Sequence, residues 1–406
     1  MLDISFVRAQ FPGLKMAEAQ GAAFFENAGG SFPCQQVIDR LTRFYETRKT
    51  QPYWYFEPSK LGGEEMDEAR TRLAALMNVA PDEVHFGPST SQNTYVLSQA
   101  LRDSFRPGDA IIVTNQDHEA NTGVWRRLEA AGFEIREWRM DPDTGHLDPV
   151  ALANLLDGHV RLVAFPHCSN VIAEINDVHA ICGMIRAAGA ISCVDGVSYA
   201  PHGLPDVGAL GPDIYLFSAY KVYGPHQGVM VMRRATNEAL PNQGHYFNAT
   251  KPTARFTPAG PDHAQIAALA GVADYLEEMA AHHGGAGKTK TEQGALAHDL
   301  MRAHETRLMQ PLLDYLGQKN SVRLLGPGQA EARAPTLAVD IGRPADPVAK
   351  ALNARGIWLG GDHFYSVRAL EGVGIDPNSG VLRMSYVHYT TAAEIDKLIA
   401  ALDEVL

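Results

Sequence analysis

The sequence predicts an α/β protein with a large domain around a mainly parallel sheet of seven strands, plus a smaller α+β domain. Between residues 64 and 232, short apolar runs alternate strictly with amphipathic stretches, which is the pattern of a parallel sheet covered by helices on both faces. After about residue 262, long helical patterns replace this alternation. At 406 residues, the chain is also too long for one small domain.

The individual elements follow from hydrophobic periodicity and from turn residues. In the first part, helices are expected over 33–50, 64–77, 89–103, 121–131 and 178–188, and strands over 84–86, 110–114, 133–138, 160–165, 190–194, 213–217 and 228–232, the last closing the sheet in either direction. In the second part, helices are expected over 262–281, 292–317, 345–354 and 392–406, and strands over 322–325, 336–340 and 381–385. We therefore predict an N-terminal segment over 1–30 that joins the small domain, a large domain over 31–261 and a small domain over 262–406.

The composition excludes several classes of function. The net charge of −12 argues against nucleic acid or an anionic membrane as a partner, because both require clustered Lys and Arg. No run of about 18 apolar residues could span a bilayer, and the N-terminus does not resemble a signal peptide. The four cysteines lack the paired spacing of a zinc site or a disulfide framework. We expect a cytoplasmic protein without a metal.

The strongest chemical signal is the stretch from Ser218 to Pro225, which reads Ser-Ala-Tyr-Lys-Val-Tyr-Gly-Pro. Its Lys221 follows an apolar strand among small and aromatic residues, so the amine is poorly solvated and can react. Asp195, in the sequence Val-Asp-Gly, ends an earlier strand. Such a lysine could hold an aldehyde cofactor as a Schiff base, and such a carboxylate could hold a pyridinium nitrogen.

Three further strands are followed by polar residues. The stretch 87–93 places Ser89 and Thr90 at a helix start, where they either bind a phosphate or simply cap the helix. His118 could stack on a flat cofactor or cap a helix, and Asn170 could donate to a cofactor oxygen. Because ligands bind at the carboxyl ends of parallel strands, we expect these side chains to meet at one edge of the sheet.

Two other features indicate a substrate site. The turn Asn27-Ala28-Gly29-Gly30 allows the backbone to approach a ligand closely, although a plain turn explains it equally well. Arg383 lies within an apolar strand, and a buried arginine needs an anion. That anion is either the α-carboxylate of a substrate or an internal Asp or Glu.

Together these residues resemble the class V aminotransferases of pyridoxal phosphate (PLP) fold type I, in particular their cysteine desulfurase-like branch. The matching motifs run in the family's order over nearly the whole chain, from residue 24 to residue 390. The resemblance implies that Lys221 binds the cofactor, Asp195 pairs with the ring nitrogen and His118 stacks on the ring. It implies further cofactor contacts from Ser89, Thr90, Asn170, Ser198, Ser218 and Gly260, substrate binding by Arg383, and a homodimer with sites at its interface.

The chain also departs from the desulfurase pattern. Desulfurases carry a nucleophilic cysteine on a C-terminal loop, whereas this chain has no cysteine after Cys193. Tyr220 precedes the lysine where desulfurases have histidine, and Ser198 stands where they usually have glutamine. The segment 257–262 lacks the usual Gly-Thr pair, so its Gly260 would offer only a backbone contact to the phosphate.

These observations predict a PLP-dependent enzyme acting on an amino acid through an external aldimine. We expect removal of the Cα proton by Lys221, then β-elimination as in a carbon–sulfur lyase; an aminotransferase, an epimerase and a catalytically silent scaffold are the alternatives. The expected substrate contacts are Asn27, Ala28, Arg383, His363 and Tyr53. Arg368 or Lys60 would either bind a second acidic group or remain solvated surface charges.

Overall fold

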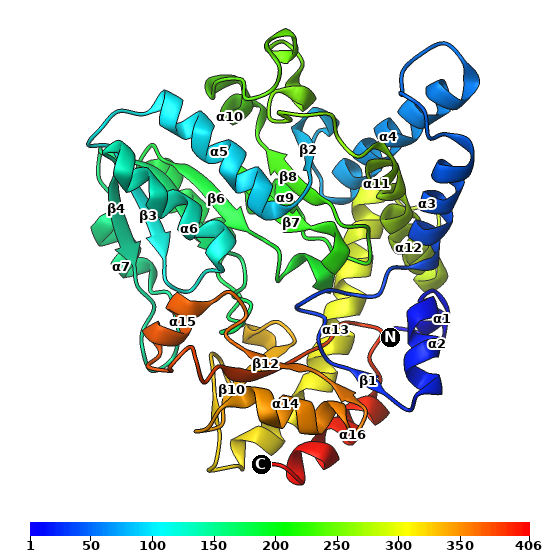
Figure 1. Cartoon of the computed structure of the whole chain (residues 1–406), viewed down its shortest axis with the longest axis vertical. Coiled ribbons are helices and arrows are strands. Elements are labelled where there is room, and N and C mark those ends of the chain that lie inside the picture. The colour runs from blue at the N-terminus through cyan, green and yellow to red at the C-terminus, as the bar shows by residue number, and fades with distance from the viewer.

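The chain is built around a seven-stranded sheet with the strand order β2-β8-β7-β6-β5-β3-β4, seen in a computed structural model that describes all residues 1–406 (Figure 1). The strands are β2 (Val84–Gly87), β3 (Ala110–Thr114), β4 (Glu134–Trp138), β5 (Val160–Pro166), β6 (Ile191–Asp195), β7 (Ile214–Ser218) and β8 (Gly228–Met232). Only β8 runs antiparallel to its neighbours, so the mainly parallel sheet is confirmed.

The expectation that β8 closes the sheet was wrong. All five residues of β8 are buried, and it pairs with β7 on one side and with β2 on the other. The edge strand is therefore β2, which comes first in the chain. A short apolar strand reads alike at an edge and inside a sheet, so its place depends on which distant strand joins it.

Helices cover both faces of the sheet, and alternate residues of each strand enter different cores. One core joins the sheet to α4 (Glu57–Leu76), α8 (Val178–Ala187), α11 (His263–Ala268) and α12 (Ala270–Ala280). The other joins it to α5 (Thr90–Ser104) and α6 (Gly123–Arg126). Shorter helices of the same domain are α7 (Pro149–Leu155), α9 (Val207–Leu210) and α10 (Arg234–Ala239).

Three expected helices have different bounds. The helix expected from residue 64 starts at Glu57, because Pro58 is tolerated in a first turn. The helix expected over 262–281 is divided into α11 and α12, and the one over 121–131 contains only one short α-helical turn between 3₁₀ turns. No helix of the chain has the length and apolarity needed to cross a membrane.

The small domain has its own sheet and core. Its sheet has the order β12-β13-β10-β9 and is antiparallel, and β1 (Ala23–Phe24) pairs in parallel with β11 (Ile357–Trp358) beside it. The other elements are β9 (Arg323–Leu324), β10 (Thr336–Asp340), α14 (Ala345–Asn353), β12 (Gly360–Asp362), α15 (Val367–Gly372), β13 (Val381–Ser385) and α16 (Ala392–Asp403). The N-terminal Ala23 and Phe25 belong to this second core.

Helix α13 (Lys290–Gly317), yellow in Figure 1, connects the two domains. Its Ala297 and Met301 pack in the core of the large sheet, whereas its residues from Leu308 onward pack in the second core. The boundary at residue 262 remains a prediction. The packing favours a division within α13, since α11 and α12 pack on the large domain.

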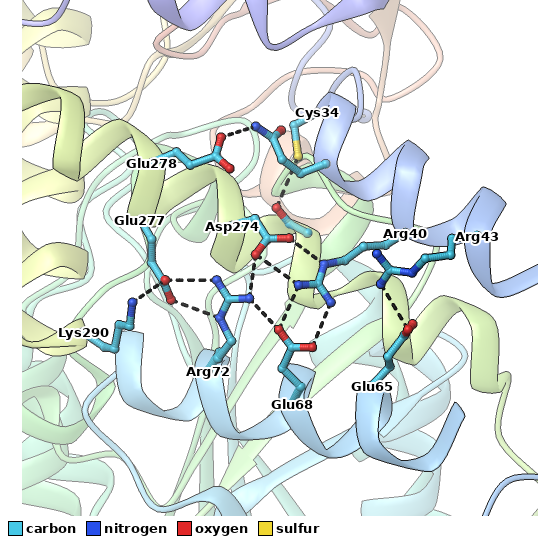
Figure 2. A network of polar contacts seen from close by, with 12 residues as sticks. Cys34, Arg40, Arg43, Glu65, Glu68, Arg72, Asp274, Glu277, Glu278 and Lys290 are labelled. Carbon is cyan, nitrogen blue, oxygen red and sulfur yellow. Dashed lines mark hydrogen bonds and ion pairs between the residues drawn. The ribbon is translucent and has the colours of Figure 1, made fainter. Parts of the chain in front are cut away.

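An ion-pair network fastens α12 to α3 (Gln35–Thr47) and α4 (Figure 2). Arg72 of α4 lies 2.7 Å from Glu68, 2.6 Å from Asp274 and 3.0 Å from Glu277. Arg40 of α3 bridges Glu68 at 2.8 Å and Asp274 at 2.5 Å. Because each arginine serves carboxylates from two different elements, the network fixes how these helices pack beside the large sheet. The remaining helices, α1 (Ile4–Ala9) and α2 (Pro12–Ala19), precede β1.

Candidate active site

A cavity of about 300 Å³ opens at the carboxyl ends of the parallel strands. The structure brings together there the side chains that the sequence predicted to meet. They are Ser89, Thr90, His118, Asn170, Asp195, Ser198, Ser218 and Lys221. A cavity of this size can hold a small cofactor with part of a substrate.

Lys221 lies on a 3₁₀ turn directly after β7 and is only 7% exposed. Its amine forms neither a hydrogen bond nor an ion pair with the rest of the chain, and it lines the cavity. Burial, followed by the charge of Arg383, lowers the pKa of Lys221 to about 8, although Asp195 and Glu26 act in the opposite direction. The amine is therefore reactive near neutral pH.

Asp195 ends β6 and presents one free carboxylate oxygen to the same cavity. Oδ1 accepts a hydrogen bond of 2.8 Å from the Val197 N–H, whereas Oδ2 has no partner within the chain. Burial raises the pKa of Asp195 to about 6, against the opposing effects of that N–H and of Lys221. A protonated ring nitrogen would supply the missing partner, so Asp195 fits a pyridine-type cofactor.

Asp117 places a second buried carboxylate next to this site, which we did not predict. It accepts hydrogen bonds of 2.8 Å from the His118 N–H and 2.7 Å from Asn121. Burial, and then the charge of Asp195, raise its pKa well above the usual value. No cation pairs with it, and its raised pKa disfavours a second negative charge beside Asp195.

His118 is a neutral ring at the start of a 3₁₀ turn. Its Nδ1 accepts a hydrogen bond of 3.0 Å from the Ala120 N–H, which leaves the ring proton on Nε2. Burial, and then the charges of Lys221 and Arg383, lower its pKa to about 3. His118 therefore caps this turn, as one of the two interpretations expected. The same ring lines the cavity, and stacking on a cofactor remains a prediction.

The start of α5 provides the features of a phosphate site. Ser89 caps the helix by accepting from the Gln92 N–H at 3.1 Å. The hydroxyls of Thr90 and Ser218 lie 2.8 Å apart, which joins the helix start to the end of β7. Gly228, at the start of β8, allows the start of α5 to lie this close to the sheet, since a Cβ there would lie 2.4 Å from the Ser89 carbonyl carbon. Hydroxyls and free N–H groups at a helix N-terminus favour an anion.

Asn170 lines the cavity but uses its amide to hold a distant loop. Its Nδ2 donates to the Phe364 carbonyl at 2.9 Å, and its Oδ1 accepts from Ser366 at 2.6 Å. Phe364 and Tyr365 have φ values of 51° and 58°, an uncommon conformation for residues with side chains. The expected contact with a ring oxygen remains a prediction and would use the second N–H of Nδ2.

Arg383 of β13 is 2% exposed, and its anion in this structure is internal. It donates to Glu26 Oε1 at 2.5 Å, and its guanidinium lies 3.6 Å from the centre of the Phe364 ring. Burial lowers the pKa of Arg383, and the ion pair with Glu26 offsets part of that effect. The internal ion pair is therefore present, and binding of a substrate carboxylate remains a prediction.

Two other cavities, one smaller and one larger, adjoin the main cavity. Asn27 and Ala28 line a cavity of about 10 Å³ next to Lys221, and Asn27 is tied to the Ser385 carbonyl at 3.3 Å. Gly260 lines a separate cavity of about 410 Å³ that also contains Ser89. These three predicted residues thus lie next to the main cavity, and none of them lines it.

Four other candidates lie outside the cavity. Tyr53 is 58% exposed and donates to Asp67 at 3.1 Å, because its loop projects from the start of α4. His363 is half-buried and accepts from the Tyr365 N–H at 3.1 Å. Arg368 pairs with Glu119 at 3.5 Å, and Lys60 pairs with Glu64 at 3.7 Å. In this structure both cations are thus engaged in ion pairs, and binding of a second acidic group remains a prediction.

Besides Asp117, sequence reasoning missed two residues of the site. His226 lines the cavity and stacks on Tyr220, with ring centres 4.8 Å apart and an interplanar angle of 1°. Its place directly after the Gly-Pro pair of the lysine motif was the available signal. Glu26 directly precedes the Asn27 turn, but nothing in the local sequence marks it as the partner of Arg383.

Comparisons with known proteins agree with this architecture. The family model described as aminotransferase class-V matches residues 23–398. The aminotransferase-like protein FGM3 of Gibberella zeae is 33% identical and aligns over 100% of this chain and 98% of its own length. A cysteine desulfurase of Serratia proteamaculans is 28% identical over 99% of this chain and 98% of its own. The fold matches a cysteine desulfurase of Thermococcus onnurineus with a TM-score of 0.86 at 20% identity, covering 100% of this chain and 98% of that one.

Proposed function

Because this chain belongs to the class V aminotransferase family, we propose that it is a pyridoxal phosphate enzyme that deprotonates an amino acid at Cα and then eliminates its β-substituent. The single observation that carries this proposal is the unpaired amine of Lys221 in a cavity with the free oxygen of Asp195. The family is dependent on pyridoxal phosphate, and the residues fit it at both ends. Asp195 faces the place for a ring nitrogen, and Ser89, Thr90 and Ser218 face the place for a phosphate.

The residues divide the work as follows. Bound in this cavity, pyridoxal phosphate supplies an electron-accepting ring that makes the Cα proton of an amino acid removable. Lys221 takes that proton on Nζ, since its lowered pKa leaves much of the amine neutral near pH 8. Asp195 holds a proton on the ring nitrogen, and neutral His118 can pack against the ring without adding charge.

Elimination fits the cysteines of this chain better than transfer of sulfur to the protein. In elimination the Cβ–S bond breaks with its electron pair on sulfur, and the unsaturated amine left behind hydrolyses to a keto acid and ammonia. A persulfide would need an accessible thiolate. Cys168 is the one cysteine that lines the cavity, but burial raises its pKa to about 12 and its Sγ lies 3.3 Å from the Ala173 carbonyl.

Transamination is the second candidate, and the name of the Gibberella zeae relative favours it. It would begin with the same proton removal by Lys221, and a keto acid would then be needed to take up the amino group of the first substrate. An assay of the purified enzyme with L-cysteine therefore separates the two candidates. Release of pyruvate, ammonia and sulfide without any keto acid supports elimination, whereas a strict keto-acid requirement contradicts it. Lys221→Ala should abolish either reaction.

We also propose that the active form is a cytoplasmic homodimer. Tyr53, Trp54, Tyr55 and Phe56 form an exposed aromatic loop, with exposures of 58%, 55%, 97% and 53%. Such a surface supports a contact with a second copy. All four cysteines are free, which agrees with a reducing compartment. Light scattering should give the mass of a dimer, and an active monomer would contradict sites shared between subunits.

A further inference from the structure

We propose that Glu26 occupies the Arg383 position in the resting enzyme as an internal stand-in for a carboxylate, so that it determines which amines bind. The inference rests on the proposed function, because it takes Arg383 as the group that receives a substrate. An amino acid must displace Glu26 with its own α-carboxylate. An amine without a carboxylate leaves the ion pair between Glu26 and Arg383 intact, so it binds next to an arginine whose charge is already compensated.

The surroundings of Arg383 leave room for only one anion. Nη2 donates to Glu26 at 2.5 Å, Nη1 donates to the backbone carbonyl of Asn170 at 3.3 Å, and Phe364 covers one face of the guanidinium at 3.6 Å. Glu26 is the only acidic side chain within ion-pair distance of Arg383. A second carboxylate can therefore bind bidentately only where Glu26 now lies.

Glu26 can move out of the ion pair toward solvent, whereas Arg383 is held in place. The side chain of Glu26 is 28% exposed, against 3% for Arg383. The Glu26 backbone is held by a β-bridge to Ser385, so the side chain can move without the chain. One carboxylate oxygen, Oε2, is buried without any hydrogen-bond partner, a cost that a move toward solvent would remove.

Two glycines shape the space that holds the Glu26 carboxylate. A Cβ on Gly29 would lie 2.7 Å from Oε1, and a Cβ on Gly360 would lie 3.4 Å from Oε2. Gly29 belongs to the Asn27 turn and Gly360 to β12, so segments from both ends of the chain form this niche. The two glycines thus leave the space that the Glu26 carboxylate fills. The charges of Glu26 and Arg383 both affect the pKa of Lys221, in opposite directions.

The consequence concerns the substrate class. A buried arginine without an anion gives an advantage to a ligand that carries a carboxylate, because a ligand that lacks one leaves the penalty of the uncompensated charge in place. Here Glu26 removes that penalty, since the arginine stays paired whether or not the ligand carries a carboxylate. We therefore infer that amines without a free carboxylate, including amino acids whose carboxyl group is derivatised, bind with affinities close to those of free amino acids.

The test measures binding to the cofactor-loaded enzyme through the absorbance of the cofactor. The probes are L-alanine and ethylamine, which differ by the carboxylate and carry no β leaving group. In the wild-type enzyme the two dissociation constants should lie within about fivefold of each other. Glu26→Gln should tighten L-alanine about tenfold, the scale of one charged hydrogen bond, and leave ethylamine within about twofold.

One variant serves as a control and another as a substitute for Glu26→Gln. Glu119→Gln removes the same charge from the surface pair with Arg368 and should change neither constant. If Glu26→Gln fails to fold, Glu26→Asp takes its place. It keeps the charge but shortens the reach of the side chain, so it should tighten L-alanine binding by a smaller factor. Propionate is a carboxylate without an amine. Calorimetry with the cofactor-free proteins should show that it binds more tightly to Glu26→Gln than to the wild type, as expected for L-alanine.

The outcomes separate this inference from the proposed function. A wild-type enzyme that binds L-alanine far more tightly than ethylamine contradicts the role of Glu26, as does weaker L-alanine binding by Glu26→Gln. Equal changes for both probes would show that Glu26 acts only on the fold. If the loaded protein responds to neither probe, the proposed function itself is wrong and the inference falls with it.

Discussion

The hydroxyl groups of Thr90 and Ser218 lie 2.8 Å apart, although 128 residues separate them along the chain. One begins helix α5 and the other ends strand β7, so the pair marks the point where the helix N-terminus meets the edge of the sheet. Both residues are buried around the same cavity. Their joint position is what a phosphate group requires: hydroxyl donors beside a positive helix end.

The first prediction tests this phosphate site. Thr90→Val removes a hydroxyl while keeping the shape of the side chain, and it should weaken cofactor binding about 5- to 30-fold, equivalent to one hydrogen bond to a charged group. Titration of the cofactor-free protein with pyridoxal phosphate measures the change. Ser98→Ala is the matched control, because Ser98 is buried on the same helix with its hydroxyl on the Tyr95 carbonyl. Equal losses in both variants would refute a specific role for Thr90.

The second prediction concerns the pH dependence of cofactor capture. Burial and then Arg383 lower the pKa of Lys221 to about 8, so the fraction of neutral amine rises as the pH passes through 8. The rate at which the cofactor-free protein captures pyridoxal phosphate should rise over the same range. Stopped-flow absorbance gives the midpoint. Arg383→Met should move the midpoint upward, since a positive neighbour is removed; a wild-type midpoint near 10 would be inconsistent with the buried amine.

The third prediction follows from the cysteines. Burial raises the pKa of Cys34, Cys168 and Cys182 to about 12, and it raises that of Cys193 well above its usual value. Titration with a thiol reagent should therefore find almost no reactive cysteine in the native protein and four after denaturation. Cys168→Ala should retain turnover of L-cysteine to within about threefold. Loss of turnover after alkylation of one native thiol would restore the persulfide mechanism.

The fourth prediction concerns the ion-pair network of Figure 2. Arg72→Met removes one cation shared by three carboxylates, leaving Arg40 and Lys290 as their remaining partners, and should lower the free energy of unfolding by about 1–3 kcal/mol, as removal of one partner from a partly buried pair does. Chemical denaturation measures the loss. Lys350→Met, which breaks the exposed pair with Asp346, should cost less than about 0.5 kcal/mol. Equal losses would mean that the network adds nothing beyond an ordinary surface pair.

The same network has a pH signature. Burial raises the pKa of Glu68, but its bonds to Arg40 and Arg72 outweigh burial, so the pKa lies below its ordinary value of 4.5. The folded state therefore holds this carboxylate ionised where the unfolded chain begins to protonate it. The stabilisation is complete above pH 4.5 and is lost as the pH falls through the lowered value. Unfolding curves of the wild type and Arg72→Met should accordingly converge in acid.

Much of the fold and the centre of the site could be predicted because they depend on local patterns. Apolar runs of strand length and the polar residues that follow them located Lys221 and Asp195 at one sheet edge. The prediction of β8 at the sheet edge failed, and Tyr53 and His363 were placed at a cavity that they do not line. These positions depend on which segments meet, and hydrophobic periodicity carries no such information.

The sequence by itself determined the cofactor chemistry of this protein, since Lys221 and Asp195 each stand in a recognisable local setting after an apolar strand. Only the tertiary structure decided what Arg383 binds at rest. Its partner Glu26 lies 357 residues away, and the two meet because the β-bridge between Glu26 and Ser385 joins the N-terminal turn to β13. A buried charge must find an opposite charge, but packing between distant segments chooses which one.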